Sequence, residues 1–495
     1  MLRDLNNFLS VFLLQDMHKS ANFINMFNER TLIVFLAFLI FLLMLITCFV
    51  IFLRTCVNGS AFFFKNVENL LALFVVCFAL LCIGLSIFDL TSAADTFTVK
   101  PRTAYTVNKL FLILFTLTVP VTFTLLVKNE KLTTFFCTFN FLILLFVVLF
   151  LIYTESLLGL VMGYELVFLP SFLIMRKTVY SASAQSAYSV FTVWSVLGSL
   201  IVVAGAVFVV VKTGEHSFFK IQAALQGWDN TELLALSFFF FIGFGVKVPI
   251  WPFHYWLTRV HVEASTGFSI FLSGFLVKAA VFVCWKTITG LGLQLLNPLF
   301  VTLCLFSVLD GVLKLSIQTD IKKLVAFATV FEMGLIYFFL LWKPIQSFSY
   351  IFSFCFAHAF LSGLMFFLVD LIYARTKTRS VDFLGGLAVF FPGLSKAVWA
   401  MLFIFWGLPY TLKFFIELWV LLGVFQTGSL GLFILILMIL VFANVFVTKV
   451  WTQVLYGSPL KKNLANDLNT WEWCFVGYLI ILSVIPSIAF SNLEV

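Results

Sequence analysis

The chain has 495 residues, of which 62% are hydrophobic and only 11% are charged. Soluble domains carry about 25% charged residues, so this composition, with a mean hydropathy of +1.12, excludes a soluble enzyme and indicates a multi-pass membrane protein. The net charge of +8 comes from basic residues scattered over short loops. That distribution argues against a nucleic-acid partner and is typical of loops that follow the positive-inside rule.

Windows of about 20 apolar residues predict about fourteen membrane-spanning helices. The predicted spans, in chain order, are 31–53, 67–89, 106–127, 133–153, 157–175, 188–211, 232–258, 266–289, 294–316, 323–342, 349–373, 399–421, 428–450 and 472–491. No loop between them is long enough to form a soluble domain. The sequence therefore predicts an all-α polytopic membrane protein.

Two helix-breaking segments divide this series of spans. One lies near residues 247–252 in the seventh span, and the other lies near 407–409 in the twelfth. A five-span offset reverses orientation in the membrane, so we predict two bundles that form an inverted repeat. The predicted regions are N-terminal helices at 1–130, a first helix bundle at 131–290, a second helix bundle at 291–450 and a C-terminal helix at 451–495.

The first break combines a charge with two prolines. Lys247 lies in an apolar run, and Pro249 and Pro252 follow it. A lysine near the middle of a bilayer costs about 2.5 to 3.5 kcal/mol on insertion scales, so it requires a partner or water. The prolines remove backbone donors, which lipid tolerates only where the freed carbonyls line protein or a cavity. Transport proteins build ion sites beside such breaks. The polar residues that follow are His254, His261 and Glu263.

Buried charges also occur away from the break. Glu165 lies near the middle of the fifth span, where an unpaired carboxylate would be protonated. Lys247 is the candidate partner that would keep it ionised, and a purely structural ion pair is the alternative. Lys278 is central in its span, which argues against snorkelling to the surface. Asp310 and Asp370 lie nearer to span ends, and we interpret them as solvated.

Later spans add further titratable residues. Glu332 and His358 lie in successive spans and can pass protons on, although a lone histidine on an apolar face is as often a core residue. Glu417 follows the second break at Pro409 and is a candidate terminal proton carrier. Lys413 is four residues earlier on the same helix face, so a local ion pair is the alternative. The candidate proton path is Glu165, Lys247, Lys278, Glu332, His358 and Glu417.

Other chemistries are disfavoured. The nine cysteines form no CxxC pair, which argues against an iron–sulfur or zinc site. There is no Walker A loop and no GxGxxG motif. His254 and His261 can share a helix face, but a bis-histidine haem needs facing histidines on a second helix, and only His358 lies inside another span. We therefore expect no metal and no cofactor in this chain.

Six segments around the buried charges and the two breaks carry a specific resemblance to a known family. They resemble the signatures of the antiporter-like membrane subunits of respiratory complex I, the proton-pumping NADH:ubiquinone oxidoreductase. The matching segments are VKVP at 246–249, HYWL at 254–257, VHVEA at 260–264, QTDIKKL at 318–324, YEL at 164–166 and GLP at 407–409. The resemblance covers residues 155–420.

The resemblance implies fourteen spans and a role in proton translocation. It makes Glu165 and Lys247 the coupled pair, Lys278 the central lysine and Glu417 the terminal group. A terminal carboxylate favours the chain 4 branch of the family, because chains 2 and 5 usually have lysine there. The lack of the long C-terminal lateral helix typical of chain 5 favours the same branch. The supporting residues are His254, His261, Glu263, Pro249 and Pro409.

The resemblance also implies partners and a location. FMN, iron–sulfur clusters and ubiquinone would lie in partner subunits, and this chain would contact other membrane-arm subunits, neighbouring antiporter-like chains and lipid, with cardiolipin as a candidate. Sixty-seven phenylalanines indicate the nucleotide bias of an organellar genome. The expected location is the mitochondrial inner membrane rather than a bacterial plasma membrane. A stand-alone cation/proton antiporter and a structural membrane scaffold are the alternatives.

Several positions depart from the family pattern. Ser265 stands where proline is usual, and Asp370 stands where a neutral polar residue is common. Glu332 stands where histidine is usual, and Lys413 is an extra charge beside Glu417. A glutamate and a histidine differ in resting charge. Glu332 therefore predicts an altered neighbour, which the sequence does not identify.

Overall fold

A computed structural model describes residues 102–130, 132–179, 181–293, 297–342, 348–458 and 466–490. All of them belong to one compact unit that runs from Phe74 to Val495. Within these ranges the regular structure is helical, with two isolated bridges, Ser156–Ser217 and Asp320–Ser380, and no strand. The predicted all-α fold class is confirmed. The spans expected at 31–53 and 67–89 lie outside the described residues.

The helices follow the predicted spans closely. In chain order they are α4 (Arg102–Glu130), α5 (Thr134–Tyr153), α6 (Leu157–Lys177), α7 (Ala182–Thr213), α8 (Phe218–Leu225), α9 (Asn230–Lys247), α10 (Tyr255–Glu263), α11 (Thr266–Phe271), the π-helical turn η1 (Leu272–Leu276), α12 (Val277–Leu291), α13 (Pro298–Leu315), α14 (Ile321–Trp342), α15 (Phe348–Thr376), the 3-10 turn η2 (Val381–Phe383), α16 (Leu387–Phe390), α17 (Pro392–Phe405), α18 (Leu412–Gln426), α19 (Leu430–Tyr456) and α20 (Thr470–Phe490). In the described part of the chain, ten helices are long and apolar enough to cross a membrane.

Two further predicted spans are not among these ten helices. The span at 399–421 is divided between α17 and α18, and the span at 472–491 corresponds to α20. The short helix α8 was not predicted, because its length is far below the window that detects a membrane span. Its buried residues Phe218, Ile221 and Leu225 recur at helical spacing, so α8 packs one apolar face onto the bundle.

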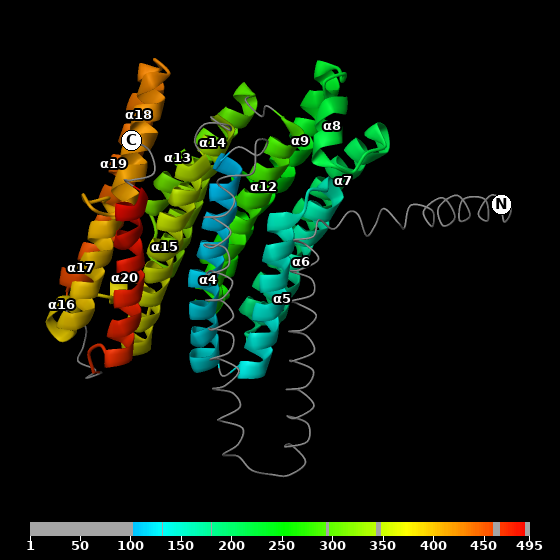
Figure 1. Ribbon diagram of the computed structural model, residues 1–495. Coiled ribbons are helices and arrows are strands. Elements are labelled where there is room, and N and C mark those ends of the chain that lie inside the picture. The colour runs from blue at the N-terminus through cyan, green and yellow to red at the C-terminus, as the bar shows by residue number, and fades with distance from the viewer. Residues whose placement is uncertain are drawn as a thin grey trace, which may run out of the picture. The chain divides into compact units, whose positions relative to one another are not determined.

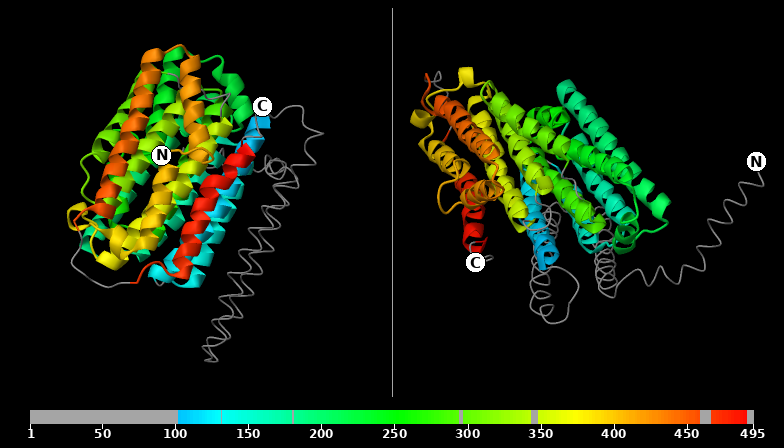
Figure 2. Two further views of the ribbon diagram at one scale, coloured as in Figure 1. Left: turned by 90° about the vertical axis from the view of Figure 1, so that its left-hand side faces the viewer. Right: turned by 90° about the horizontal axis from the view of Figure 1, so that it is seen from above.

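The helices stand side by side in an order that broadly follows the chain (Figure 1). α5, α6 and α7 lie at one side and α16 to α20 at the other, with α12, α14 and α15 between them, and the view from above agrees (Figure 2). The spanning windows of α11 to α12, α14 and α15 are buried throughout. These central helices carry Lys278, Glu332 and His358, so these three groups lie inside the bundle rather than against lipid.

Close packing between α7 and α9 fixes the position of Lys247. A Cβ atom added to Gly243 would lie 2.6 Å from Val202 Cγ2, and one added to Gly198 would lie 3.1 Å from Lys247 Cγ. Small residues let two helix backbones approach each other inside a membrane. The glycines therefore bring the end of α9, with its lysine, directly against α7.

The first predicted break is confirmed at residues 248–254, between α9 and α10. Ile250 N–H donates to the carbonyl of Gly245 at 3.0 Å. The indole N–H of Trp256 donates to the carbonyl of Val246 at 2.8 Å. Protein groups thus satisfy carbonyls that the interrupted helix leaves open, which is the condition for a break at membrane depth.

The second predicted break is confirmed at residues 406–411, between α17 and α18. Gly407 has a φ of +66°, in the left-handed region, as does Tyr410 with a φ of 74°. A Cβ atom on Gly407 would lie 2.8 Å from Glu417 Oε2. Glycine at this position therefore serves both the backbone conformation and the close approach of the glutamate.

A third irregularity was not predicted. The span expected to be continuous at 266–289 contains the π-helical turn η1, and Lys278 follows directly in α12. π-helical turns are rare in proteins, and those that occur are often found at functional sites. Hydropathy does not detect such a turn, because it changes hydrogen bonding without changing the apolar character of the segment.

Ser265 has a structural role that explains its departure from proline. It is the N-cap residue of α11, and its hydroxyl accepts a hydrogen bond from Phe268 N–H at 3.4 Å. Serine is among the preferred N-cap residues. The helix therefore begins at this position without a proline.

Candidate functional site

The first pair, Glu165 with Lys247, is in contact, as the sequence predicted. Lys247 Nζ lies 3.4 Å from Glu165 Oε1. Ser199 on α7 bridges them, because Lys247 Nζ donates to its Oγ at 2.5 Å and the hydroxyl donates to Glu165 Oε2. The lysine side chain is 1% exposed and the glutamate side chain is 29% exposed. The hydroxyl of Ser199 thus links a buried ammonium to a carboxylate that is partly exposed at the protein surface.

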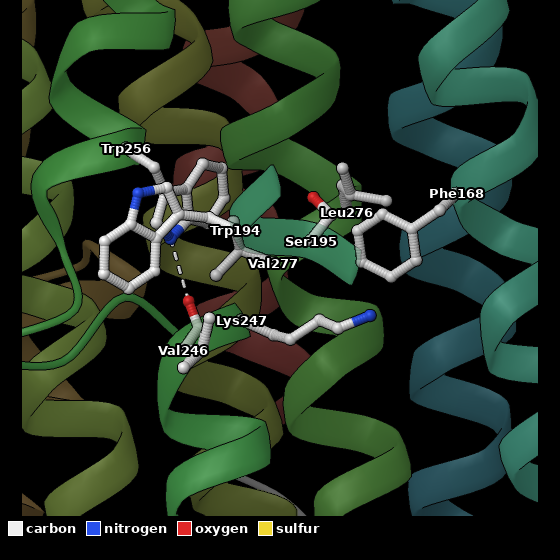
Figure 3. A pocket seen from close by; sticks show the side chains of 8 residues that line it. All are labelled: Phe168, Trp194, Ser195, Val246, Lys247, Trp256, Leu276 and Val277. Atoms are coloured by element: carbon white, nitrogen blue, oxygen red, sulfur yellow. Dashed lines mark hydrogen bonds between the residues drawn. The ribbon is translucent and has the colours of Figure 1, made fainter. Parts of the chain in front are cut away.

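Aromatic rings and a small cavity surround Lys247. Its Nζ lies 3.7 Å from the ring centre of Phe168 and 4.7 Å from that of Tyr164, and Figure 3 shows the side chain running toward Phe168. Such cation–π contacts offset part of the loss of water. The volume open to the centre of a water molecule in this cavity is about 10 Å³. That is roughly enough for one water molecule. Its lining residues are Phe168, Trp194, Ser195, Val246, Lys247, Trp256, Leu276 and Val277.

His254 belongs to a second polar cluster at the first break. Its Nε2 lies 3.2 Å from Asp310 Oδ2, and Lys314 Nζ donates to the same oxygen at 2.7 Å. Asp310 and Lys314 are four residues apart on α13, so they share a helix face. Asp310 is therefore paired with His254 and Lys314, and the interpretation of it as simply solvated is wrong. The cluster attaches the start of α10 to α13.

The other supporting residues lie apart from the first pair. His261 is fully buried and stacks on Phe366 with ring centres 4.6 Å apart. Glu263 accepts a hydrogen bond from Ser183 Oγ at 2.7 Å, which joins the end of α10 to α7. Pro249 lies within the first break, and Pro409 lies within the second.

The structure brings Lys278 and His358 together in a central pair, a contact that the sequence did not predict. The Lys278 ammonium contacts His358 Nδ1 and donates to the carbonyl of Ser273. That carbonyl belongs to η1, so the π-helical turn supplies an acceptor for the lysine. Ser273 Oγ also lies 3.0 Å from Ser362 Oγ on α15. The irregular turn therefore couples the lysine to the helix that carries the histidine.

Glu332, Lys413 and Glu417 form what we call the terminal cluster. Lys413 Nζ lies 2.8 Å from Glu332 Oε1 and 3.6 Å from Glu417 Oε1. The three side chains are 2%, 3% and 15% exposed, in the order of the chain. The local pair on α18 exists, but the shorter contact crosses to α14. Lys413 is therefore the altered neighbour that Glu332 predicted, and the two departures compensate each other.

A narrow cavity separates the central pair from the terminal cluster. It lies between α14 and α15 and has no room for the centre of a water molecule. His358 Nε2 and Glu332 Oε2, the atoms not engaged by lysine, have no hydrogen-bond partner among the described residues. The path between the two groups is thus closed in this structure. The lining residues are Val325, Ala328, Thr329, Glu332, His358, Leu361, Ser362 and Met365.

Comparison with known proteins places this geometry in a family. Residues 154–448, more than half of the chain, match the family described as NADH:quinone oxidoreductase/Mrp antiporter, transmembrane region. The chain belongs to this family. The matched region includes both breaks and all six residues of the candidate proton path.

Related proteins agree with this assignment. NADH-ubiquinone oxidoreductase chain 4 of Paramecium tetraurelia is 36% identical over 369 residues, which cover 73% of this chain and 76% of that protein. NADH-quinone oxidoreductase subunit M of Rickettsia conorii is 27% identical over 342 residues, covering 65% and 66%. A chain in the structure of the Mrp complex from Dietzia sp. DQ12-45-1b superposes with a TM-score of 0.69 over 81% of this chain and 78% of its own length. Its identity is 17%, so it supports the antiporter-like helical fold alone.

Sequence reasoning missed one member of the first pair's hydrogen-bond network and one partner in the terminal cluster. Ser199 lies among other small residues in α7, and nothing in the local sequence distinguishes it. Lys413 was assigned only to its own helix. Counting buried charges by span would have found it, because Glu332 had no cationic partner nearby in the sequence.

Proposed function

We propose that this chain is a proton-translocating membrane-arm subunit of respiratory complex I, of the chain 4 or subunit M type. The observation that carries the proposal is the series of buried charges across the bundle: the first pair, the central pair and the terminal cluster. Ionisable groups at membrane depth are expensive and mark proton or ion pathways when they face the bundle interior. The names of the two related oxidoreductase subunits support the same role.

In this function the chain's own residues move protons, and redox chemistry belongs to partner subunits. The signal from electron transfer shifts the balance of the first pair, in which Ser199 links ammonium to carboxylate. Leu276 and Val277, which line the cavity beside Lys247, directly precede Lys278. Movement of the Lys247 charge is therefore felt at the central pair, and a proton passes by way of Lys278 and His358 toward Glu417.

The proposal includes partners and a location. We expect FMN, iron–sulfur clusters and ubiquinone in partner subunits, which makes this chain a component of an NADH:ubiquinone reductase without redox chemistry of its own. Other membrane-arm subunits, including antiporter-like chains, and lipid with cardiolipin as a candidate would cover its outer helices. The chain 4 relative supports the mitochondrial inner membrane as the location.

Two measurements test this function. Purification of the chain from its native membrane should recover flavin and iron–sulfur subunits with it. In the intact complex, Lys247→Ala should abolish proton pumping through this chain while the assembled complex remains. Lys449→Ala is the matched control, because Lys449 is an exposed lysine on α19 away from the path.

The alternatives give different results. A stand-alone cation/proton antiporter would purify without flavin and iron–sulfur subunits and would still lose transport in Lys247→Ala. A structural scaffold would purify with them, but its Lys247→Ala variant would pump normally. Either result would contradict the proposed function.

A further inference from the structure

The terminal cluster repeats the residue types of the first pair in the corresponding spans of the second bundle, with the lysine on the other side of the break. Glu165 lies in the fifth predicted span and Glu332 in the tenth. Lys247 is the last residue before the first break, and Lys413 is the second residue of the helix after the second break. The same five-span offset that relates the two breaks thus relates both carboxylates and both lysines. The ion-pair distances are 3.4 Å in the first bundle and 2.8 Å in the second.

The second copy differs from the first in its charge balance. In the first bundle one ammonium faces one carboxylate. In the terminal cluster Lys413 faces two carboxylates, Glu332 and Glu417, so the fully ionised cluster has a net charge of −1. An uncompensated charge is costly in a buried, low-dielectric site. The cluster is therefore neutral when the two carboxylates share one proton.

The geometry allows Lys413 to contact either carboxylate. Its Nζ lies 2.8 Å from Glu332 on α14 and 3.6 Å from Glu417 on its own helix, α18. The flexible four-carbon stem of lysine can exchange partners through rotamer changes. The ring of Phe405, 3.9 Å from Nζ, stays available to the ammonium, and Gly407 places no side chain against Glu417 Oε2.

We propose that Lys413 exchanges between Glu332 and Glu417, so that the terminal cluster is a second Glu–Lys switch that converts arrival of a proton at Glu332 into release of a proton from Glu417. At the start Glu332 is ionised and bound to Lys413, and Glu417 carries the proton. A proton then binds Glu332, Lys413 moves to Glu417, and the proton of Glu417 leaves. One proton enters, one leaves, and the cluster is neutral before and after. This inference rests on the proposed function.

The unpartnered atoms show where the proton arrives. Glu332 Oε2 and His358 Nε2 both lack a hydrogen-bond partner in the described structure, and both residues line the closed cavity between α14 and α15. The hydroxyl residues Thr329 and Ser362 line it as well. Water admitted to this cavity would meet both residues that carry the unpartnered atoms, because both line it. The proton is thus delivered to the oxygen of Glu332 that Lys413 does not hold.

The test uses the intact complex and a double-mutant cycle. Lys413→Met and Glu332→Gln should each remove the contribution of this chain to the proton-to-electron ratio of the complex, because each deletes one partner of the exchange. The double variant Glu332→Gln/Lys413→Met removes both charges of the ion pair and leaves Glu417 to be neutral in its protonated form, so it should assemble normally and still fail to pump. Lys449→Met is the control for loss of a lysine outside the cluster. Normal pumping in the double variant would show that Lys413 is a counter-charge alone, and would overturn the inference.

A conservative variant keeps the test informative if Lys413→Met does not assemble. Lys413→Arg preserves the charge, and its planar fork can hold both carboxylates at once. The variant should assemble and pump several-fold more slowly, because a fixed bridge does not exchange. Pumping at the rate of the unaltered complex would contradict the exchange.

Infrared difference spectroscopy supplies a readout that a purely structural role would not change. On reduction by NADH, the unaltered complex should gain a protonated carboxyl signal assigned to Glu332 and lose one assigned to Glu417. Glu332→Gln and Glu417→Gln identify the two signals, and Lys413→Met should remove their coupled change. Two signals that change independently would contradict the switch. Loss of pumping in Lys247→Ala with normal pumping in Glu332→Gln/Lys413→Met would refute the switch and leave the proposed function standing.

Discussion

The first pair and the terminal cluster use the same two residue types in different environments. In the first pair the lysine side chain is buried, but the Glu165 side chain is 29% exposed at the protein surface. In the terminal cluster Glu332 and Lys413 are each almost completely buried. The first pair can therefore sense charge from outside the chain, whereas the terminal cluster must balance its charge from within. Position in the bundle, rather than residue type, separates the two roles.

Hydration separates the two regions in the same way. The cavity beside Lys247 has room for roughly one water molecule, whereas the cavity beside Glu332 has no room for a water molecule. Where water can enter, an ion pair can loosen without leaving either charge unsolvated. Where water is excluded, a charge can leave its partner only by finding another. Lys413 has such a second partner in Glu417.

The largest expected effect comes from removing the lysine of each region. Lys413→Met leaves two buried carboxylates without their cation, and breaking a buried pair costs about 3–5 kcal/mol. Lys247→Met should cost less, because Glu165 is partly exposed. The amount of assembled complex and the temperature at which the purified complex dissociates measure the difference. Equal losses would show that the two sites do not differ in burial as described.

Removing the bridging hydroxyl tests the first pair. Ser199→Ala deletes a group that bonds two charged side chains, and hydrogen bonds to charged groups contribute about 1.5–3 kcal/mol. We expect slower pumping and a lower dissociation temperature. The control is Ser189→Ala on the same helix, whose exposed hydroxyl donates to Gln185 O. If both variants behave alike, Ser199 is not part of the coupling.

Adding a methyl group at the second break tests the terminal cluster. Gly407→Ala should cost roughly 1–2 kcal/mol of left-handed backbone strain. It also displaces Glu417 Oε2, 2.8 Å from the new Cβ atom, and so should slow pumping. Gly428 has a similar φ of +73° with no atom within 4 Å of such a Cβ, so Gly428→Ala is the control for strain alone. Equal pumping in the two variants would contradict a role for the Glu417 position.

The smallest expected effect concerns the backbone of the first break. Trp256→Phe removes the indole N–H that donates to Val246 O, a contribution of about 0.5–1.5 kcal/mol. A slightly lower dissociation temperature, with pumping largely retained, is expected. Trp194→Phe, which changes the same cavity without removing a backbone partner, should lower it less. A larger drop in dissociation temperature for Trp194→Phe than for Trp256→Phe would show that the indole hydrogen bond does not stabilise the break.

Much of the architecture could be predicted from hydropathy and helix-breaking residues. The limits of the membrane helices, both breaks and the pairing of Glu165 with Lys247 followed from long apolar runs and the high cost of buried charge. The π-helical turn before Lys278 could not be predicted, because it leaves the apolar pattern unchanged. Ser199 was invisible because a serine in an apolar helix usually bonds its own backbone.

The terminal cluster shows a different kind of limit. Glu332 and Lys413 were both noticed as departures, but their contact joins α14 to α18 across the bundle. Spacing along the sequence pointed instead to Glu417, four residues from the lysine. Local helix geometry thus identified the weaker partner correctly and missed the stronger one, because long-range contacts depend on how the helices pack.

The central claim is that the first pair and the terminal cluster are parts of one proton path joined by Lys278. The proton-to-electron ratio of an intact complex carrying Lys278→Met tests it most directly, with Lys449→Met as the control. The account predicts that pumping through this chain is lost although both flanking ion pairs remain. A ratio equal to that of the control would contradict a single path.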